Sequence, residues 1–227
     1  MKKIVVLTGA GMSAESGLKT FRDSDGLWEN HNVYDVATPE AWERDPEMVL
    51  KFYNERRKQV RDAKPNKAHV ALGKLEEKYD VHIITQNIDN LHERAGSTQV
   101  IHLHGEVNKA RSSIDSGLVY ELDHWEMKLG DLCEKGSQLR PHIVWFGEPV
   151  PMIEKAIPIV EMADRVIVIG TSLAVYPAAG LLNYATPSSQ KYYIDPKGFE
   201  GDNHYPFVII KETAGVGVPR LVDQLLQ

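Results

Sequence analysis

The chain of 227 residues contains a single cysteine, Cys133, and no long apolar run. One cysteine excludes an internal disulfide, and it excludes a zinc site built from four thiolates. The H-E-x-x-H pattern and the nucleophile-elbow pattern are also missing. The opening apolar run stops at Thr8-Gly9, which is too short for a signal peptide, and no stretch is long enough to cross a bilayer. We therefore expect a cytoplasmic protein that does not bind membranes.

The charge balance argues against a nucleic-acid partner. Acidic side chains outnumber basic ones by 32 to 26, which gives a net charge of -6. A strong nucleic-acid binder usually carries a basic face. With 42% hydrophobic residues the chain is long enough to bury a substantial core in one domain or in two closely joined domains.

Short apolar runs bounded by polar or glycine-rich turns predict the buried strands of a parallel sheet. The predicted strands are Lys2–Leu7, Val81–Ile84, Val100–Leu103, Ala163–Gly170, Gln190–Asp195 and Phe207–Lys211. Spacings of three and four between apolar residues predict helices over Pro39–Gln59, Ala68–Tyr79 and Val218–Leu226. The polar segment 106–140 has no clear periodicity, so we expect a small insertion outside a sheet. The chain is thus predicted to have an α/β fold.

Polar or glycine-rich residues follow four of these strands, at Gly9–Gly17, Gln86–Asp89, His102–His104 and Gly170–Ser172. The carboxyl ends of parallel strands line one crevice, so we expect these segments to converge there. Glycines at a strand-to-helix turn let backbone N–H groups approach a phosphate, and a histidine near an asparagine and an aspartate can act as a general base. The glycine spacing differs from G-x-G-x-x-G, however, so the glycines alone are equally compatible with a tight structural turn.

Two arginines are open to a functional and to a structural interpretation. Arg22 lies in a polar loop with two aromatic residues, which favours a ligand contact over a surface ion pair with Asp23 or Asp25. Arg56 lies three residues after Tyr53 on a predicted helix. From the pattern alone, we interpret this pair as a half-buried tyrosine beside a solvated arginine.

The ordered motifs resemble those of one enzyme family, the sirtuins, which are NAD-dependent protein lysine deacylases. The resemblance extends over essentially the full length of the chain. It rests on Gly9-Ala-Gly-Met-Ser-Ala-Glu-Ser-Gly17, Phe21-Arg22, Thr85-Gln-Asn-Ile-Asp89, His102-Leu-His-Gly105, Phe146-Gly-Glu148, Gly170-Thr-Ser172 and Val175-Tyr-Pro177. Any one of these blocks is weak support, but their order along the chain is specific.

The resemblance implies a Rossmann-like parallel sheet with helices on both faces plus a small inserted lobe. It implies one catalytic domain, with an NAD-binding lobe at 1–28, 72–105 and 141–227 and a small lobe at 29–71 and 106–140. The residues implied to contact NAD are Gly9, Ala10, Gly11, Ser13, Gly17, Phe21, Arg22, Trp28, Gln86, Asn87, Ile88, Asp89, Gly170, Thr171, Ser172, Asp195 and Ala214. Asp195 departs from the asparagine that is usual in the family.

The resemblance also implies the chemistry. NAD is consumed: the acyl-lysine amide oxygen attacks C1' of the nicotinamide ribose, and His104 acts as general base on a ribose hydroxyl to give 2'-O-acyl-ADP-ribose. Asn87 and Asp89 join His104 as catalytic residues, whereas His102 is interpreted as structural. The acyl-lysine protein substrate is expected to bind as an extended strand, and the residues implied to hold it are Phe146, Gly147, Glu148, Val175, Tyr176 and Pro177. An NAD-dependent mono-ADP-ribosyltransferase and an inactive NAD-sensing module are the alternatives.

Two departures from the family pattern predict special properties. The positions of the family's four zinc-binding cysteines are Ser112, Asp115, Cys133 and Gly136, so we expect no zinc. We expect apolar residues to hold the insertion instead, namely Leu118, Tyr120, Leu122, Trp125 and Leu129.

The second departure concerns the acyl pocket. Ala37, Tyr53 and Arg56 match the residues of sirtuins that remove negatively charged acyl groups. This match reverses the interpretation of the Tyr53 and Arg56 pair made from the pattern alone. It implies desuccinylase and demalonylase activity beside deacetylation.

Overall fold

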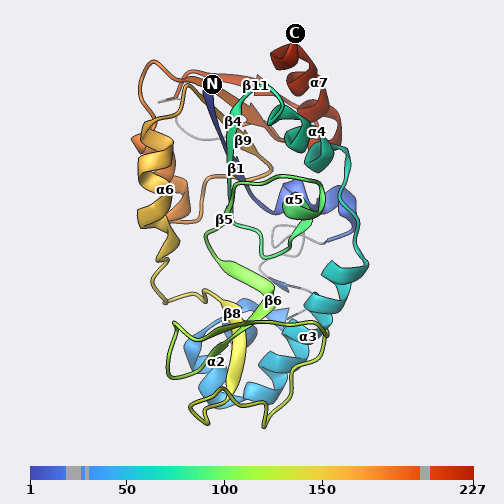
Figure 1. Cartoon of the computed structure of the whole chain (residues 1–227), viewed down its shortest axis with the longest axis vertical. Helices are drawn as coiled ribbons and strands as arrows, with labels where there is room; N and C mark the ends of the chain where they lie inside the picture. Colours follow the sequence, from blue (N-terminus) through green and yellow to red (C-terminus); the bar gives the residue numbers. More distant parts are fainter. Residues whose placement is uncertain (19–26, 29–30, 200–204) are drawn as a thin grey trace.

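The computed structural model describes residues 1–18, 27–28, 31–199 and 205–227 (Figure 1). Its centre is a six-stranded parallel sheet with the strand order β11-β10-β9-β1-β4-β5. The strands are β1 (Lys3–Thr8), β4 (Asp80–Thr85), β5 (Val100–His102), β9 (Arg165–Ile169), β10 (Gln190–Ile194) and β11 (Phe207–Ile210). The predicted α/β fold and its parallel sheet are confirmed.

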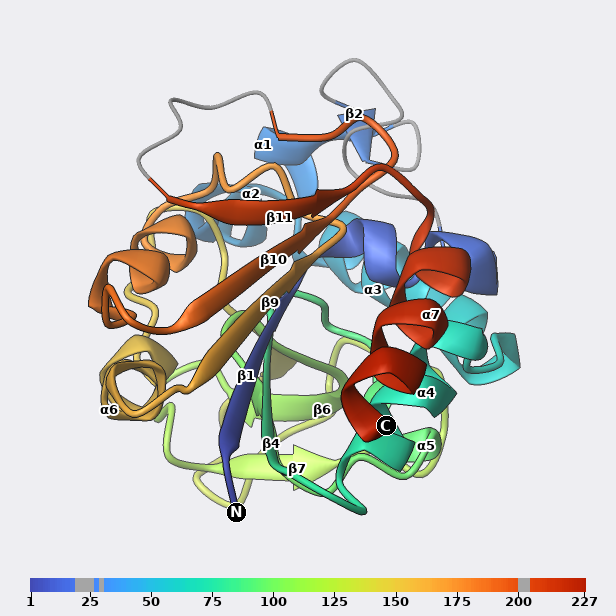
Figure 2. The same cartoon turned by 90° about the horizontal axis from the view of Figure 1, so that it is seen from above.

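Helices cover both faces of this sheet, as Figure 2 shows from above. Alternate residues of β1 point to opposite faces. Ile4 and Val6 pack in a cluster with residues of α4 (Lys67–Leu75) and α7 (Ala214–Leu226). Val5 and Leu7 pack with α6 (Met152–Glu161) and the 3-10 helix η4 (Ala178–Tyr184). Burial on both faces explains why the strands are continuous apolar runs.

A smaller lobe lies beyond the carboxyl ends of the sheet (Figure 1). It contains α1 (Val33–Val36), α2 (Pro39–Arg44), α3 (Pro46–Asp62) and an antiparallel sheet in the order β7-β6-β8. Its strands are β6 (Gly105–Ser112), β7 (Val119–Glu121) and β8 (Leu139–Ile143). The expectation that 106–140 lies outside a sheet was wrong. The buried positions of β6 are mostly small residues, such as Ala110 and Ser112, so its alternation is hidden in the sequence.

The single helix predicted over Pro39–Gln59 is in fact two helices. Asp45 separates α2 from α3 and has a non-helical backbone, with φ -151° and ψ 78°. Its carboxylate accepts a hydrogen bond from Met48 N at 2.9 Å and so caps α3. Pro46 then starts α3, because a residue that precedes proline is disfavoured in helical conformation.

The apolar residues expected to hold the insertion do so only in part. Leu122 packs against a buried cluster of Leu50, Ala110 and Met127, but Trp125 and Leu129 are exposed. Much of the remaining support is polar. The buried Arg57 guanidinium donates to Val107 O at 2.6 Å and to Trp125 O at 2.7 Å, and thereby joins α3 to the insertion.

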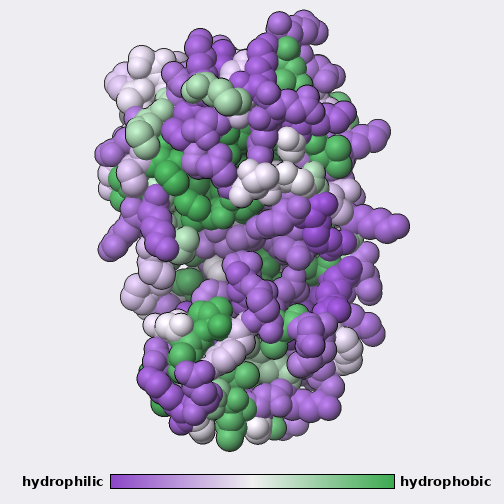
Figure 3. Space-filling view, in the orientation of Figure 1, coloured by the Kyte–Doolittle hydropathy of each residue, from purple (hydrophilic) through white to green (hydrophobic). Residues whose placement is uncertain are grey.

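The face of the molecule seen in Figure 3 is largely hydrophilic, with apolar patches beside α6 and on the small lobe. In the described part of the chain, no helix combines the length and the apolar character needed to span a bilayer.

Gly105, where β6 begins, provides a test of how the small sheet is joined to the large one. Its φ is +81°, and a Cβ atom there would lie 2.0 Å from His142 O on β8. We expect Gly105→Ala to lower the free energy of unfolding by more than about 4 kcal/mol in urea denaturation. Gly130 is the matched control, because its φ is +94° and a Cβ atom would meet nothing within 4 Å. Gly130→Ala should cost only about 1 kcal/mol. Equal losses in the two variants would show that the contact with β8 does not constrain residue 105.

Candidate active site

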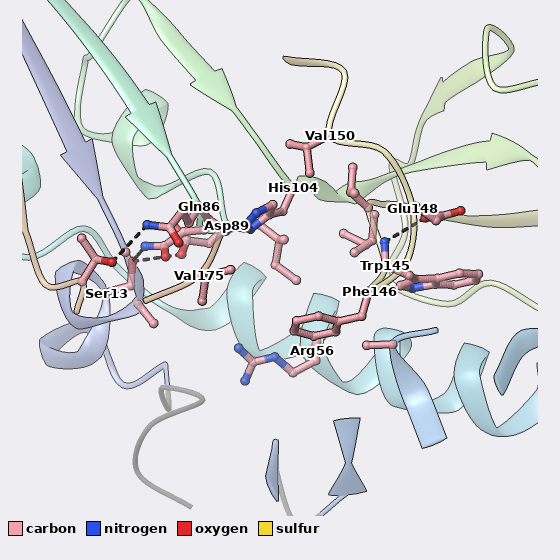
Figure 4. Close-up of a pocket in the computed structure, with 18 of the residues that line it drawn as sticks. Ser13, Arg56, Gln86, Asp89, His104, Trp145, Phe146, Glu148, Val150 and Val175 are labelled. Carbon is pink, nitrogen blue, oxygen red and sulfur yellow. Dashed lines mark hydrogen bonds between the residues drawn. The ribbon is translucent and has the colours of Figure 1, made fainter. Parts of the chain in front are cut away.

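A cavity of about 420 Å³ lies where the two sheets meet. Residues from the carboxyl ends of β1, β4 and β9 line it, together with the turn after β5, helix α3 and the segments after β8 and β9 (Figure 4). The cavity brings together most of the residues selected from the sequence: Gly9, Ala10, Ser13, Ala37, Tyr53, Arg56, Gln86, Asn87, Ile88, Asp89, His104, Phe146, Gly147, Glu148, Gly170, Thr171, Ser172, Val175, Tyr176 and Pro177.

A few selected residues are not brought into this lining. Gly11, Gly17, Asp195 and Ala214 lie outside it. The Asp195 side chain accepts a hydrogen bond from Lys197 N at 3.0 Å, and Ala214 is the first residue of α7. Phe21 and Arg22, which were predicted to contact NAD, lie outside the described residues. Trp28 belongs to the short strand β2 (Leu27–Trp28), which pairs with β3 (His31–Asn32), and its side chain is outside the description.

Several lining residues were not predicted from the sequence, and all of them are apolar. They are Leu18, Val60, Ile143, Val144, Trp145, Val150 and Ala174. Trp145 and Val144 could have been found, because they directly precede the selected segment at Phe146. Ala174 likewise directly precedes the selected segment at Val175. The others give no signal in a single sequence, since an apolar residue in a cavity wall has the same pattern as one in the core.

The glycines after β1 make a backbone contact with the turn after β9. Gly9 N donates to Ile169 O at 3.0 Å, and Gly11 N donates to Gly170 O at 2.9 Å. A Cβ atom at Gly9 would lie 2.7 Å from Thr171 Cβ, and one at Gly11 would lie 2.7 Å from Gly170 Cα. The two turns can therefore approach this closely only because residues 9 and 11 have no side chain. The exposed backbone at the ends of parallel strands fits a nucleotide.

Ser13 connects the two polar groups at the floor of the cavity. Its hydroxyl donates to Asp89 Oδ2 at 2.9 Å and accepts from Asn87 Nδ2 at 3.1 Å (Figure 4). Leu91 N donates to the other carboxylate oxygen of Asp89 at 3.1 Å. Burial raises the pKa of Asp89, although the hydrogen bonds from Leu91 and Ser13 oppose this effect. The amide and the carboxyl group are thus held in fixed positions before any ligand binds.

His104 has the geometry of a general base. Its Nδ1 lies 3.1 Å from Gln86 O, and because a carbonyl can only accept, Nδ1 carries the proton. The lone pair then belongs to Nε2. Burial lowers the pKa of His104, which outweighs the opposing effect of the Gln86 carbonyl, so the ring is neutral at neutral pH. Figure 4 shows His104 between Ser13, Gln86 and Asp89 on one side and Trp145, Phe146 and Glu148 on the other.

His102 has a different place and a different environment. It is not among the lining residues, and its ring is buried beneath the loop that carries Asn87. Its Nδ1 lies 2.9 Å from Asn87 O, and its Nε2 lies 2.8 Å from Glu93 Oε1. Burial alone would lower the pKa of His102, but the hydrogen bond and charge of Glu93 outweigh it and raise the pKa.

At the far end of the cavity, Tyr53 and Arg56 project from α3. Arg56 is only 5% exposed and Tyr53 is fully buried, so the interpretation of a half-buried tyrosine beside a solvated arginine was wrong. Trp145 Nε1 donates to the Tyr53 hydroxyl at 3.1 Å, and burial raises the pKa of that hydroxyl. Arg56 NH1 donates to Gln59 Oε1 at 2.9 Å. The buried Ala37 completes this end with a small side chain.

Glu148 lines the cavity, but its carboxylate is engaged in the small lobe. It accepts hydrogen bonds from Arg111 at 3.0 Å, from Arg140 at 2.8 Å and from Trp145 N at 2.8 Å. The Arg140 guanidinium also lies 3.3 Å from the centre of the Trp145 ring. Burial raises the pKa of Glu148, but the arginines and Trp145 N outweigh it and lower the pKa. Glu148 is therefore an ionised residue that positions the cavity wall.

At the four positions that match zinc-binding cysteines in the resemblance, two of the side chains have other partners. The Cys133 thiol donates to the Ser112 hydroxyl at 3.3 Å, and Asp115 forms an ion pair with Lys135 at 2.7 Å. Gly136 carries no side chain that could act as a ligand. Across the described ranges, no group of three or more His, Cys, Asp or Glu side chains could hold a metal ion. The residues present do not fit a zinc ion.

Comparisons with known proteins agree with this geometry. The sequence model of the Sir2 family matches residues 9–177. Relatives from Helicobacter pylori and Bacteroides thetaiotaomicron, each named an NAD-dependent protein deacylase, are both 52% identical and cover 100% of this chain and 99% of their own length. A solved complex of a Sir2 homologue with NAD has a TM-score of 0.89 and 41% identity, and it covers 99% of this chain and 90% of that chain.

Proposed function

The chain belongs to the Sir2 family and is an NAD-dependent protein deacylase, and we propose that it removes succinyl and malonyl groups as well as acetyl groups from lysine. The observation that carries the proposal is the position of Arg56. Its guanidinium is buried in the same cavity as His104, at the end lined by Tyr53 and Ala37. A buried cation at the end of an acyl pocket favours an acyl group that ends in a carboxylate.

Different segments of the cavity wall hold different parts of NAD. Gly9, Ala10 and the Gly170–Ser172 turn hold the phosphate and adenosine part, and Gln86–Asp89 hold the nicotinamide part. This assignment is supported by the bare backbone of the turns and by the fixed amide and carboxyl groups beside Ser13. When bound, NAD supplies an electrophilic ribose carbon and nicotinamide as the leaving group.

His104 moves the proton. Its neutral ring presents the Nε2 lone pair, which accepts a proton from a ribose hydroxyl, while the Gln86 carbonyl keeps the other proton on Nδ1. A positioned base of this kind contributes about 10² to 10⁴ in rate. Exclusion of water and alignment of the reacting groups by the buried cavity must supply much of the rest.

The acyl-lysine segment of the substrate binds as an extended strand between residues 146–148 and 175–177. Both segments line the cavity, and both expose apolar side chains there, with Phe146, Val175 and Tyr176 all exposed. A strand added between two such segments gains main-chain hydrogen bonds, which do not depend on substrate sequence. Any accessible acyl-lysine loop therefore qualifies as a substrate.

The protein also functions without a structural zinc ion. The hydrogen bond between Cys133 and Ser112 and the ion pair between Asp115 and Lys135 support this proposal, because they join the two turns that a zinc ion would join. Arg57 and the apolar cluster around Met127 stabilise the rest of the lobe.

Elemental analysis of the purified protein tests the proposal on zinc. We expect less than about 0.1 zinc ion per chain, and we expect a chelator to leave the melting temperature unchanged, because no folding free energy comes from metal binding. A zinc enzyme carried through the same purification serves as the positive control. Stoichiometric zinc would contradict the proposal.

Kinetics of Arg56→Met test the acyl specificity. A charge-assisted hydrogen bond contributes about 1.5 to 3 kcal/mol, so kcat/KM for a succinyl peptide should fall by about 10- to 100-fold. The rate for the matched acetyl peptide should change by less than about threefold, because that acyl group has no carboxylate. Arg61→Met is the matched control on the same helix, since Arg61 is exposed and donates to Asp123 O. Equal losses for both peptides in Arg56→Met would refute the specificity.

A further inference from the structure

His102 lies between a backbone carbonyl and the carboxylate of Glu93, whose pKa is lowered, so both groups can only accept hydrogen bonds. Nδ1 faces the Asn87 carbonyl at 2.9 Å, and Nε2 faces the Glu93 carboxylate at 2.8 Å. A neutral imidazole has one N–H group and can donate to only one of them. Two short contacts with acceptors therefore require a proton on both nitrogens. This environment is the opposite of that of His104, whose Nδ1 donates to Gln86 O and whose Nε2 must keep a lone pair to act as a base.

We propose that His102 is a positioning residue that works as an imidazolium, held in that form by Glu93, and that it fixes the Asn87 carbonyl and with it the loop Gln86–Asp89. The inference rests on the proposed function, in which that loop binds nicotinamide. The two histidines of the His102-Leu-His104 motif then act in opposite protonation states. The protein is active only at a pH at which His104 is neutral and His102 is charged.

The charged groups around His102 favour the cation. Glu93 comes from α5 (Leu91–Arg94), Asp89 from the loop after β4, and Glu106 from β6, and all three are acidic. Lys109 on β6 is the nearby cation, and its interaction is with Glu106 and Glu121. His92 is fully buried, and burial lowers its pKa well below the ordinary value, so it remains neutral.

The Asn87 carbonyl is one of three groups of this residue that form hydrogen bonds, and its partner is His102. Its N–H donates to Thr85 Oγ1 at 3.0 Å, and its side-chain amide donates to Ser13 Oγ at 3.1 Å. When His102 loses a proton, its single N–H cannot serve Asn87 and Glu93 together. The loop then loses a contact as the pH rises through the pKa of His102. The loss of this contact misplaces the loop Gln86–Asp89, which lowers turnover even though the fold persists.

The pH profile of Glu93→Gln tests the proposal. In the wild type, the rate of free lysine peptide formation at saturating NAD and acyl peptide should fall on the acid side as His104 is protonated and on the alkaline side as His102 is deprotonated. Glu93→Gln removes the charge that holds the proton, so the alkaline limb should move to lower pH by about one unit or more, while the acid limb stays in place. Glu106→Gln is the matched control, because it removes a nearby charge that makes no hydrogen bond to His102. In Glu106→Gln, the alkaline limb should move by less than half of the shift seen in Glu93→Gln.

Imidazole ¹⁵N NMR gives a second readout that does not depend on activity. His102→Gln identifies the His102 signal among the nine histidines. The wild-type signal should titrate with a midpoint above 6.5 and show two protonated nitrogens below that midpoint, and the midpoint should be lower in Glu93→Gln. A wild-type midpoint below 6.5, or an alkaline limb that does not move in Glu93→Gln, would overturn the proposal. If the wild type releases no nicotinamide, the proposed function fails, whereas the wild-type NMR midpoint still decides the state of His102.

Discussion

Three consecutive carbonyl groups, those of Gln86, Asn87 and Ile88, accept hydrogen bonds from His104, His102 and Val107, in that order. His102 is the last residue of β5, His104 lies in the turn after it, and Val107 lies in β6, so these bonds fix the ends of β4 and β5 to one another. Together these bonds orient the His104 ring, the backbone of Asn87 and the first residues of β6. The geometry of the whole site depends on them, because a buried carbonyl that loses its donor costs about 1 to 3 kcal/mol.

The same arrangement connects the loop Gln86–Asp89 to helix α3. Arg94, on the helix that follows this loop, donates to Val60 O at 2.9 Å near the end of α3, and Arg57 on α3 donates to Val107 O. Helix α3 also carries Tyr53 and Arg56. The end of the cavity lined by Tyr53 and Arg56, which we propose holds the acyl group, is therefore fixed to the loop whose Gln86 carbonyl orients His104.

The sheet and the convergence of its polar loops could be predicted from the sequence because both follow from local patterns. Buried parallel strands are apolar runs, and their carboxyl ends meet at one edge. The burial of Arg56, the sheet formed by β6 and the break at Asp45 were missed. Arg56 and β6 depend on partners distant in the sequence, and the break was concealed by an apolar spacing that continues across Asp45-Pro46. The charge state of His102 was also hidden, since it requires Glu93 on another element.

A product balance tests the central claim most directly, namely that this cavity transfers an acyl group from lysine to the ADP-ribose part of NAD with His104 as the base. The wild type is incubated with NAD and a succinyl-lysine peptide, and all products are followed by mass spectrometry. We expect nicotinamide, free lysine peptide and succinyl-ADP-ribose in equal amounts, and we expect His104→Ala to form almost no free peptide. ADP-ribose left attached to protein, or no release of nicotinamide, would contradict the claim.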